Sequence, residues 1–359
     1  MSKCSTEIVI GMDLSDKKSE ICEMNYSNGK INTRANVANN SESLSTFFSQ
    51  YPDPKRVLIA MEAGTHSPWI SVLLSDMGFD VIIGNPRKLK FIWKSDKKSD
   101  RRDAEMLARI ARFDTELFYP ISHRSRESQS VLAVLKARDA LVKTRTLLIN
   151  SVRGMLKSMG YTPPSCSASA FAEKIAKEMP EEYLYALTET IEIIGQITQS
   201  VKGYDKKIKN LCKEKYPETE ILQQVNGVGP ITSLAFVLTL EEPGRFNKSR
   251  YVGCYLGLVP RRDQSGEIDK QLGITKAGNA YLRSLLVQCA QYILGPFGDD
   301  CELRRFGEKL AARGGKASKK KAIIAVARKL SILLHRLWAD NATYDQFYLK
   351  NKKISKKSA

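Results

Sequence analysis

Short apolar runs alternate with polar turns through the first quarter of the chain, which is the pattern of a small sheet with helices. The run from residue 6 ends at Asp13, and Asn28-Gly29 separates two further strand-like segments as a hairpin turn would. The expected strands cover residues 6–13, 19–26, 30–37, 56–61 and 79–83, and the expected helices residues 42–51 and 67–77.

Three strands in a meander, followed by alternating helix and strand, is the order of the ribonuclease-H-like fold.

Two long segments later in the chain have the apolar spacing of helices. Apolar residues recur every seven positions over 127–158, in the columns that contain Val134 and Leu135, and again over about 180–213 from Leu187. These two long helices, joined by a loop rich in Pro and Ser, predict a coiled-coil-like hairpin that serves as a spacer or as a dimer surface.

After Pro217 the pattern changes to shorter helices. Gly227-Val228-Gly229 is typical of the turn in a helix-hairpin-helix element, where glycines allow backbone N–H groups to face a phosphate. A helix with a turn is expected over 246–258, a second helix from about Lys276 to Leu294 and a last one over 320–338. We therefore predict four regions: an α/β domain at 1–122, a helical connector at 123–216, a mainly α-helical domain at 217–345 and a basic tail at 346–359.

Four carboxylates in the first third carry the candidate chemistry. Asp13 and Glu62 each end an apolar strand, and Asp100 and Asp103 stand three residues apart at the start of a helical pattern. We expect Asp100 to be the N-cap of that helix and Asp103 its N3 residue, with both side chains at one helix end. Acids also favour helix N-termini for dipole reasons alone. The combination of all four favours a two-metal phosphoryl-transfer site.

Charge separates the ends of the chain. Residues 1–122 contain 17 Lys and Arg against 16 Asp and Glu, whereas residues 301–359 contain 16 against 4, within a net charge of +18. This asymmetry indicates a polyanionic partner for the C-terminal part. The basic stretch at 87–98 is either a phosphate contact or a solvated loop.

The remaining composition excludes several classes of site. Seven scattered cysteines, without a C-x-x-C pair, argue against a zinc ribbon or a disulfide framework and fit the cytoplasm. The three histidines, His66, His123 and His335, are too few for a His-rich metal site and are read as structural or incidental. Without a run of about 18 apolar residues or a leader pattern, no membrane association is expected.

Several motifs together resemble the DEDD transposases of bacterial insertion sequences, a family of bridge-RNA-guided recombinases. They are Ile10-Gly11-Met12-Asp13, Glu62-Ala63-Gly64-Thr65, Ser99–Ala104, Val225–Gly229, Gly257–Gly266 and Lys276–Arg283. The resemblance runs through the whole chain. His66 is a small departure, because relatives commonly have tyrosine there.

The resemblance implies a RuvC-like domain whose four acids hold Mg²⁺, or Mn²⁺ in its place, and a separate transposase domain with Ser265 as nucleophile. It implies donor and target DNA as substrates, a noncoding guide RNA, and a homodimer or homotetramer. Without the resemblance, Ser265-Gly266 reads as an ordinary polar turn. The expected nucleic-acid contacts are Arg261, Arg262, Lys276, Asn279, Arg283, Gly227, Gly229, Lys319, Lys320 and Lys321.

Two alternatives remain open from the sequence. A RuvC-like structure-specific endonuclease of the Holliday-junction-resolvase type would use the same four acids with water as nucleophile. A nucleic-acid-binding protein with a decayed site would use none of them, although all four acids are present in order.

Overall fold

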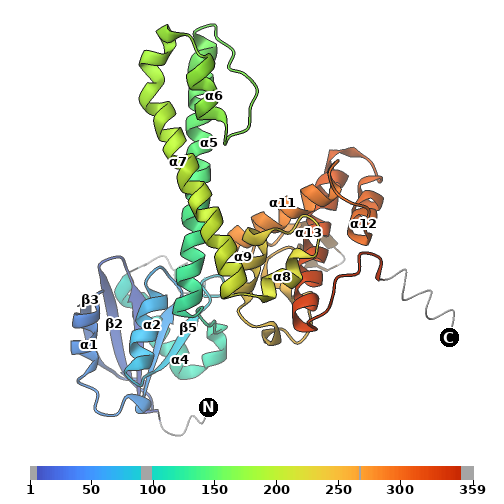
Figure 1. The fold of residues 1–359 in the computed structure, drawn as a ribbon. Helices are drawn as coiled ribbons and strands as arrows, with labels where there is room; N and C mark the ends of the chain where they lie inside the picture. Colours follow the sequence, from blue (N-terminus) through green and yellow to red (C-terminus); the bar gives the residue numbers. More distant parts are fainter. Residues whose placement is uncertain (1–5, 90–98, 267, 349–359) are drawn as a thin grey trace, which may run out of the picture. The chain divides into compact units, whose positions relative to one another are not determined.

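The structure is a computed structural model that describes residues 6–89, 99–266 and 268–348. The chain divides into two compact units, Met1–Arg124 and Ser125–Ala359 (Figure 1). The second unit contains both the region predicted as a connector and the region predicted as a separate helical domain. Of the predicted tail, only residues 346–348 lie within the described part of the chain.

The first unit is built on a five-stranded mixed sheet with the order β3-β2-β1-β4-β5. The first three strands are antiparallel neighbours, whereas β1, β4 and β5 run parallel. All five predicted strands are present, and this ribonuclease-H-like arrangement confirms the expected fold class of the N-terminal part. The strands are β1 (Ile8–Leu14), β2 (Lys18–Asn25), β3 (Ile31–Ala38), β4 (Val57–Glu62) and β5 (Asp80–Gly84).

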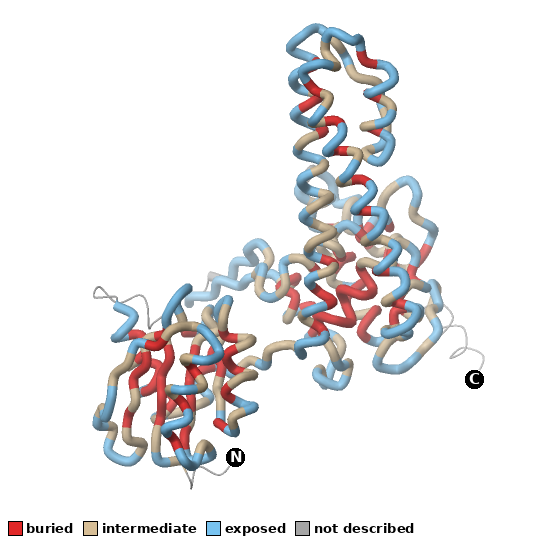
Figure 2. The backbone as a smooth tube through the Cα atoms, turned by 60° about the vertical axis from the view of Figure 1, so that its left-hand side comes forward, coloured by how far each residue is buried: buried red, intermediate tan, exposed pale blue. Residues whose placement is uncertain are grey.

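Helices cover both faces of this sheet, so the strands carry apolar residues on both sides. Helices α1 (Ser41–Phe48) and α2 (Ser67–Asp76) pack on the face that includes Met12 and Met61. Helix α4 (Asp100–Phe113) packs on the opposite face with Val9 and Ala60. Figure 2 shows the buried residues concentrated along the strands between these layers. The sheet is therefore fixed on both faces, which holds the strand ends rigidly.

A long helical hairpin begins the second unit (Figure 1). Its arms are α5 (Arg126–Ser158) and α7 (Glu181–Glu214), both predicted, and a short unpredicted helix, α6 (Phe171–Glu178), lies between them. The predicted column of α7, at Leu187, Ile194, Val201 and Ile208, is buried along its whole length. On α5 the column of Leu135 is the more buried of the two predicted columns.

The middle of this hairpin buries little of α5, and the two apolar clusters lie toward its ends. Residues 136–148 of α5 are all described and none is buried. At this waist Arg138 Nε donates to Asp205 at 2.7 Å and Arg145 Nη1 donates to Thr198 Oγ1 at 3.4 Å. One apolar cluster, around Phe171, lies beyond the waist, and another joins the base of the hairpin to the rest of the unit.

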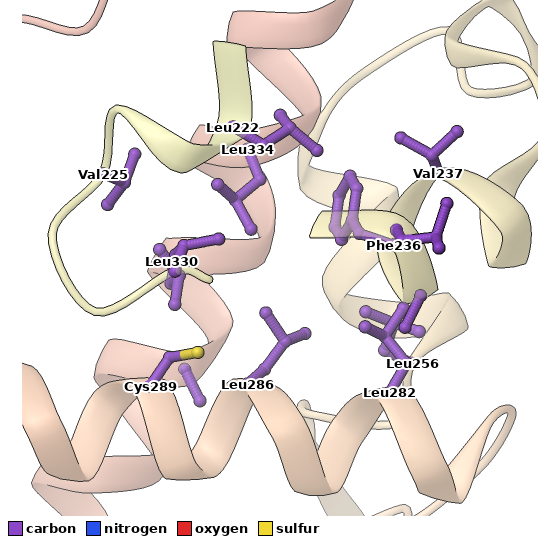
Figure 3. Close-up of a cluster of buried hydrophobic side chains, with 14 of the residues drawn as sticks. Leu222, Val225, Phe236, Val237, Leu256, Leu282, Leu286, Cys289, Leu330 and Leu334 are labelled. Carbon is purple, nitrogen blue, oxygen red and sulfur yellow. The ribbon is translucent and has the colours of Figure 1, made fainter. Parts of the chain in front are cut away.

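The rest of the second unit is mainly helical, as predicted. Its core is centred on α9, which is buried at every residue from Thr232 to Leu240. Figure 3 shows Phe236 of α9 with Leu282 and Leu286 of α11 in this core. The helices are α8 (Glu218–Gln223), α9 (Pro230–Leu240), α10 (Arg250–Tyr255), α11 (Ala280–Leu294), α12 (Glu302–Ala311) and α13 (Gly315–Ala339).

Besides α6, three features of this unit differ from the sequence predictions. Helix α12 was not predicted, and neither was the two-stranded hairpin of β6 (Pro260–Ser265) and β7 (Ile268–Ile274). Helix α13 begins five residues earlier than expected, because lysine is a good helix former and does not interrupt the pattern. In the described part of the chain, no helix combines the length and apolar character that a membrane span requires.

Candidate active site

Asp13 and Glu62 stand side by side at the carboxyl ends of two adjacent strands. Strands β1 and β4 are parallel, and their register pairs Met12 with Met61, so the two acids follow at the next level. Because side chains alternate along a strand, both acids lie on the face that α4 covers. The sheet therefore delivers two half-buried carboxylates to one point.

Gly11 determines how closely α4 approaches this point. A Cβ atom at residue 11 would lie 2.0 Å from the carbonyl oxygen of Ala104 and 2.5 Å from the backbone nitrogen of Ala108. Only glycine allows this contact. The later residue Leu107 packs with Val9, so the start of α4 lies toward Asp13. The glycine therefore places the first turn of α4 beside the strand ends.

The first turn of α4 carries the other two acids, but not at the helix positions we expected. Ser99, and not Asp100, is the N-cap, and its side chain accepts a hydrogen bond from Arg102 N at 3.4 Å. Asp100 is therefore the first helical residue and Asp103 the fourth. Both Ser and Asp are good N-cap residues, so composition alone does not choose between neighbours. Asp103 is only 8% exposed, whereas Asp100 is exposed, so the two carboxylates have different environments.

Arg34 of β3 ties the start of α4 to the sheet. Its Nη1 donates to the carbonyl oxygen of Arg101 at 3.1 Å, and its Nη2 bonds the carboxylate of Glu105. Hydrogen bonding to Arg34 lowers the pKa of Glu105, and Arg109 adds to this effect. Arg34 is not among the predicted site residues, because a single arginine in a polar strand carries no signal of this contact.

The loops that follow the two acid-bearing strands also meet. His66, four residues after Glu62, has Nε2 at 3.6 Å from a carboxylate oxygen of Asp16, three residues after Asp13. Its Nδ1 accepts a hydrogen bond from Trp69 Nε1 at 3.0 Å, which leaves the ring proton of a neutral imidazole on Nε2. The sequence prediction took His66 as structural or incidental. Its position four residues after Glu62 is the signal that could have placed it near the acids.

The four acids supply the right chemistry for a hard divalent cation, since all their donors are carboxylate oxygens. Within residues 6–89, 99–266 and 268–348, however, no three His, Cys, Asp or Glu side chains are grouped so that they could hold a metal ion. The structure thus brings Asp13 and Glu62 to one edge and the start of α4 toward it, without forming a finished ligand set. The basic stretch at 87–98 lies outside the described residues, apart from Arg87, Lys88 and Leu89.

Ser265 lies in the second unit, at the end of β6, where its backbone partner in the hairpin is Ile268. Every residue of β6 is exposed. Gly266 follows in the left-handed region with φ +56°, which lets the chain turn directly after the serine. This arrangement presents the serine hydroxyl at the tip of a polar hairpin.

The two arginines predicted beside the serine differ in their contacts. Arg262 Nε donates to Asp269 of β7 at 2.7 Å, and its Nη2 donates to the other carboxylate oxygen. This pairing raises the pKa of Arg262 and lowers the pKa of Asp269. Arg261 is exposed on the same strand. A phosphate at Arg262 would compete with Asp269.

Other predicted contact residues have structural partners in this unit. Asn279 is the N-cap of α11 and accepts from Leu282 N at 3.0 Å. Arg283 is half-buried, and its Nη1 donates to the carbonyl oxygens of Leu256 and Ala277. These hydrogen bonds hold the loop before α11 in place, so Asn279 and Arg283 have a structural role there. Lys276 is exposed and has φ +52°.

The predicted glycine turn joins α8 to α9. Gly227 has φ +87°, and a Cβ there would lie 2.8 Å from Cδ1 of Tyr292 on α11. Gly229 is the N-cap of α9, and a side chain there would meet no atom within 4 Å. The three lysines predicted to precede the last helix lie within its first two turns, exposed on α13: Lys319, Lys320 and Lys321.

Two family models match this chain. Residues 219–297 match the model described as the Transposase IS116/IS110/IS902 family, and residues 10–160 match a transposase model of the DEDD type named for IS110. The second match contains all four acids, and the first contains Ser265. The two matched ranges together account for most of the described sheet and helical core.

Curated relatives agree with these matches. The transposase for insertion sequence element IS1111A of Coxiella burnetii is 28% identical over 345 residues, which cover 94% of this chain and 91% of the relative. The transposase for insertion sequence element IS1328 of Yersinia enterocolitica is 26% identical, over an alignment that covers 79% of this chain and 83% of the relative. A pilin gene-inverting protein of Moraxella bovis is 25% identical, with 69% and 68% covered.

A DEDD transposase domain implies a divalent metal in general terms, which agrees with the all-carboxylate donor set of this sheet edge. With both matches in chain order and relatives that align along nearly its whole length, the chain belongs to the IS110/IS116/IS1111 family of transposases, which are DNA-processing enzymes.

Proposed function

We propose that this transposase cuts and rejoins DNA through a covalent bond between Ser265 Oγ and a DNA phosphorus atom. The observation that carries the proposal is the in-register pair of Asp13 and Glu62 on adjacent parallel strands, with α4 seated beside them by Gly11. The carboxylates that would hold Mg²⁺, or Mn²⁺ in its place, are Asp13, Glu62, Asp100 and Asp103.

A serine hydroxyl is a weak nucleophile at neutral pH and needs activation. A divalent cation held by the acids would supply it by neutralising phosphate charge and stabilising the attacking and leaving oxygens. As the Oγ–P bond forms, one P–O ester bond breaks and the serine proton passes to the released sugar oxygen. Attack by the sugar hydroxyl of another strand reverses this step, joins the DNA and restores Ser265.

The exposed position of Ser265 supports this exchange, because a hydroxyl at a hairpin tip can reach a phosphate without displacing core residues. A relative is named for inverting the pilin gene, and inverting a DNA segment requires both cutting and rejoining. A covalent intermediate conserves the bond energy that rejoining needs, whereas hydrolysis loses it.

The proposal includes a noncoding guide RNA that selects donor and target DNA by base pairing, and a homodimer or homotetramer. The net charge of +18 supports a large polyanionic partner. For backbone contacts we propose Arg261, Arg262, Lys276 and the three lysines at the start of α13. We leave out Asn279 and Arg283, since their bonds hold the loop before α11.

The test is to incubate the protein with its RNA, Mg²⁺ and end-labelled DNA and to look for a covalent protein–DNA adduct on a denaturing gel. We expect an adduct that maps to Ser265 by mass spectrometry and that is lost in Ser265→Ala. A matched control is Ser200→Ala, which removes the hydroxyl of an exposed serine on α7 and should leave the adduct unchanged.

The same experiment separates the second candidate, an endonuclease that uses water. DNA ends that appear at the normal rate in Ser265→Ala, without any adduct in the unsubstituted protein, would establish hydrolysis. Loss of all DNA processing in Asp13→Asn is expected from both candidates and rules out a protein that only binds nucleic acid.

A further inference from the structure

A groove of about 490 Å³ lies in the second unit, between the loop that joins α8 to α9 and one face of α11. The end of α8 contributes Gln223, the loop contributes residues 225–229, and α11 contributes Leu285, Gln288, Cys289 and Tyr292. This volume falls within the range of about 300–1,000 Å³ that is typical of small-ligand sites. Figure 3 shows Val225 of the loop and Cys289 of α11, two of these lining residues, within the buried cluster.

The lining of the groove is uncharged. It includes no Lys, Arg, Asp or Glu among the described residues, in a protein with a net charge of +18. At one edge Asn226 Nδ2 bonds the carboxylate of Asp299, which makes that edge acidic. The groove therefore offers no cation to pair with a phosphate group, and the carboxylate at its edge would repel one. For this reason the groove is not suited to the nucleic-acid backbone.

The groove has two other kinds of surface. The side chains of Gln223, Asn226 and Gln288 provide carboxamides, each of which has a donor and an acceptor side. Tyr292 provides an aromatic ring that is 42% exposed and packs against Gly227, where a Cβ would come within 2.8 Å of Cδ1. The Gly227 backbone thus supports the ring from one side, and the ring remains accessible to a ligand.

An aromatic face combined with amide groups is the chemistry that binds an unpaired base, by stacking on the ring and hydrogen bonding at the base edge. We propose that this groove binds one unpaired nucleobase of a single-stranded segment, stacked on Tyr292 and bonded by the carboxamides. The inference rests on the proposed function only in supplying the nucleic acid. The base comes from DNA or from RNA, and the experiment distinguishes these sources.

The experiment measures binding of fluorescein-labelled single-stranded DNA, single-stranded RNA and duplex DNA to the full-length protein over a range of salt concentrations. Tyr292→Ala removes the stacking face, and we expect it to weaken single-strand binding by about 5- to 100-fold, the range for loss of one stacked base. Tyr292→Phe keeps the face and should bind within about twofold of the original protein. The arm that loses more affinity, DNA or RNA, identifies the source of the base.

Salt dependence separates base binding from phosphate binding. Because no charge is removed, the slope of log K against log salt should be the same in Tyr292→Ala as in the unsubstituted protein, whereas Lys320→Ala should reduce the slope by about one. The control is Tyr185→Ala, which removes a 91% exposed ring from α7 and should leave both affinity and slope unchanged.

Gln288→Leu provides a second variant, because the residue is exposed and its loss should not disturb the core. We expect it to change the relative affinities for the four homopolymer sequences. Equal single-strand affinity in Tyr292→Ala and the unsubstituted protein, or a changed salt slope in the folded variant, would overturn the proposal. A failed adduct test at Ser265 with an intact Tyr292 effect would overturn only the proposed function.

Discussion

Strand β1 and strand β6 carry the two halves of the proposed chemistry, and they are opposite in character. Strand β1 lies at the centre of a sheet covered on both faces, and Asp13 is the residue before its last. Strand β6 has one neighbour and is exposed at every residue, and it ends in Ser265. Each strand has a reactive side chain near its end. Packing on both faces holds Asp13 in place, whereas Ser265 is held only by its hairpin.

This difference follows from what each group must do. Acids that hold a cation need a fixed geometry, because electrostatic stabilisation depends on groups that do not reorganise during the reaction. A nucleophile that carries a DNA strand must approach and leave the phosphate, which a core position would prevent. We therefore expect substitutions near Asp13 to affect both stability and activity, and substitutions near Ser265 to affect activity alone.

The largest effect is expected at the acids. Asp13→Asn should reduce DNA cleavage on the order of 10³-fold or more, since several kcal/mol of transition-state stabilisation depend on the bound cation. The measurement is the rate of cleavage of labelled DNA in Mg²⁺. Glu42→Gln, at an exposed residue of α1, is the control. Equal rates in Asp13→Asn and the unsubstituted protein would remove this edge of the sheet from the reaction.

The next effect compares one substitution on both strands. Gly11→Ala forces α4 away from β1, because the new Cβ would lie 2.0 Å from a backbone oxygen, and overpacking of this kind costs about 1–3 kcal/mol or more. In Gly266→Ala the new Cβ would meet no atom within 4 Å. The cost of about 1–2 kcal/mol then comes only from the positive φ of residue 266, and the strain is confined to the β6–β7 hairpin. Urea unfolding should show a lower midpoint for Gly11→Ala alone, and the opposite order would contradict the comparison.

A smaller effect is expected from two arginines. Arg34→Gln releases the start of α4 and should lower cleavage about tenfold, equivalent to about 1.4 kcal/mol, with a matching loss of Mg²⁺ affinity by calorimetry. An Arg34→Gln protein with full Mg²⁺ affinity would show that the contact between Arg34 and α4 is not needed.

Arg262→Gln breaks an exposed ion pair with Asp269 and should leave thermal unfolding unchanged. The DNA affinity of this variant should depend less steeply on salt, by about one unit of slope.

The smallest effect concerns the end of the first unit. His123 Nε2 lies 2.9 Å from Ser67 Oγ, and burial, with the nearby charge of Arg124, lowers the pKa of His123. The neutral form is therefore favoured in the folded state. Its contribution to stability is complete above the unfolded pKa of about 6.5 and decreases as the pH falls toward the folded value. Urea midpoints between pH 7.5 and 5.5 should decline less in His123→Gln, and parallel declines would contradict this assignment.

The sequence predicted the buried parts of the fold well, because burial leaves a periodic pattern. Strands β1 and β4 and the column of Leu187 on α7 followed directly from apolar spacing. Strand β6 was missed for the same reason, since Pro-Arg-Arg-Asp-Gln-Ser has no apolar residue on either face. A strand held by backbone bonds and a polar cross-strand pair leaves no hydrophobic signal.

The candidate site was predictable where it depends on strand ends, and less so where it depends on contacts. The neighbouring positions of Asp13 and Glu62 follow from two parallel strands with an acid at or next to the last residue. The N-cap at Ser99 and the tie from Arg34 depend on local geometry and on residues far apart in the chain. Neither spacing nor composition records such contacts.

The waist of the α5–α7 hairpin has a consequence for how the protein opens. The two apolar clusters at the ends of the hairpin share no residue, and between them Thr198 and Val201 are the buried residues of α7, so opening of one end removes few contacts from the other. The end around Phe171 is then a separate cooperative unit, whose backbone amides exchange with deuterium independently of those near α9. We therefore expect the hairpin to bend most easily at residues 136–148, where α5 has no buried side chain.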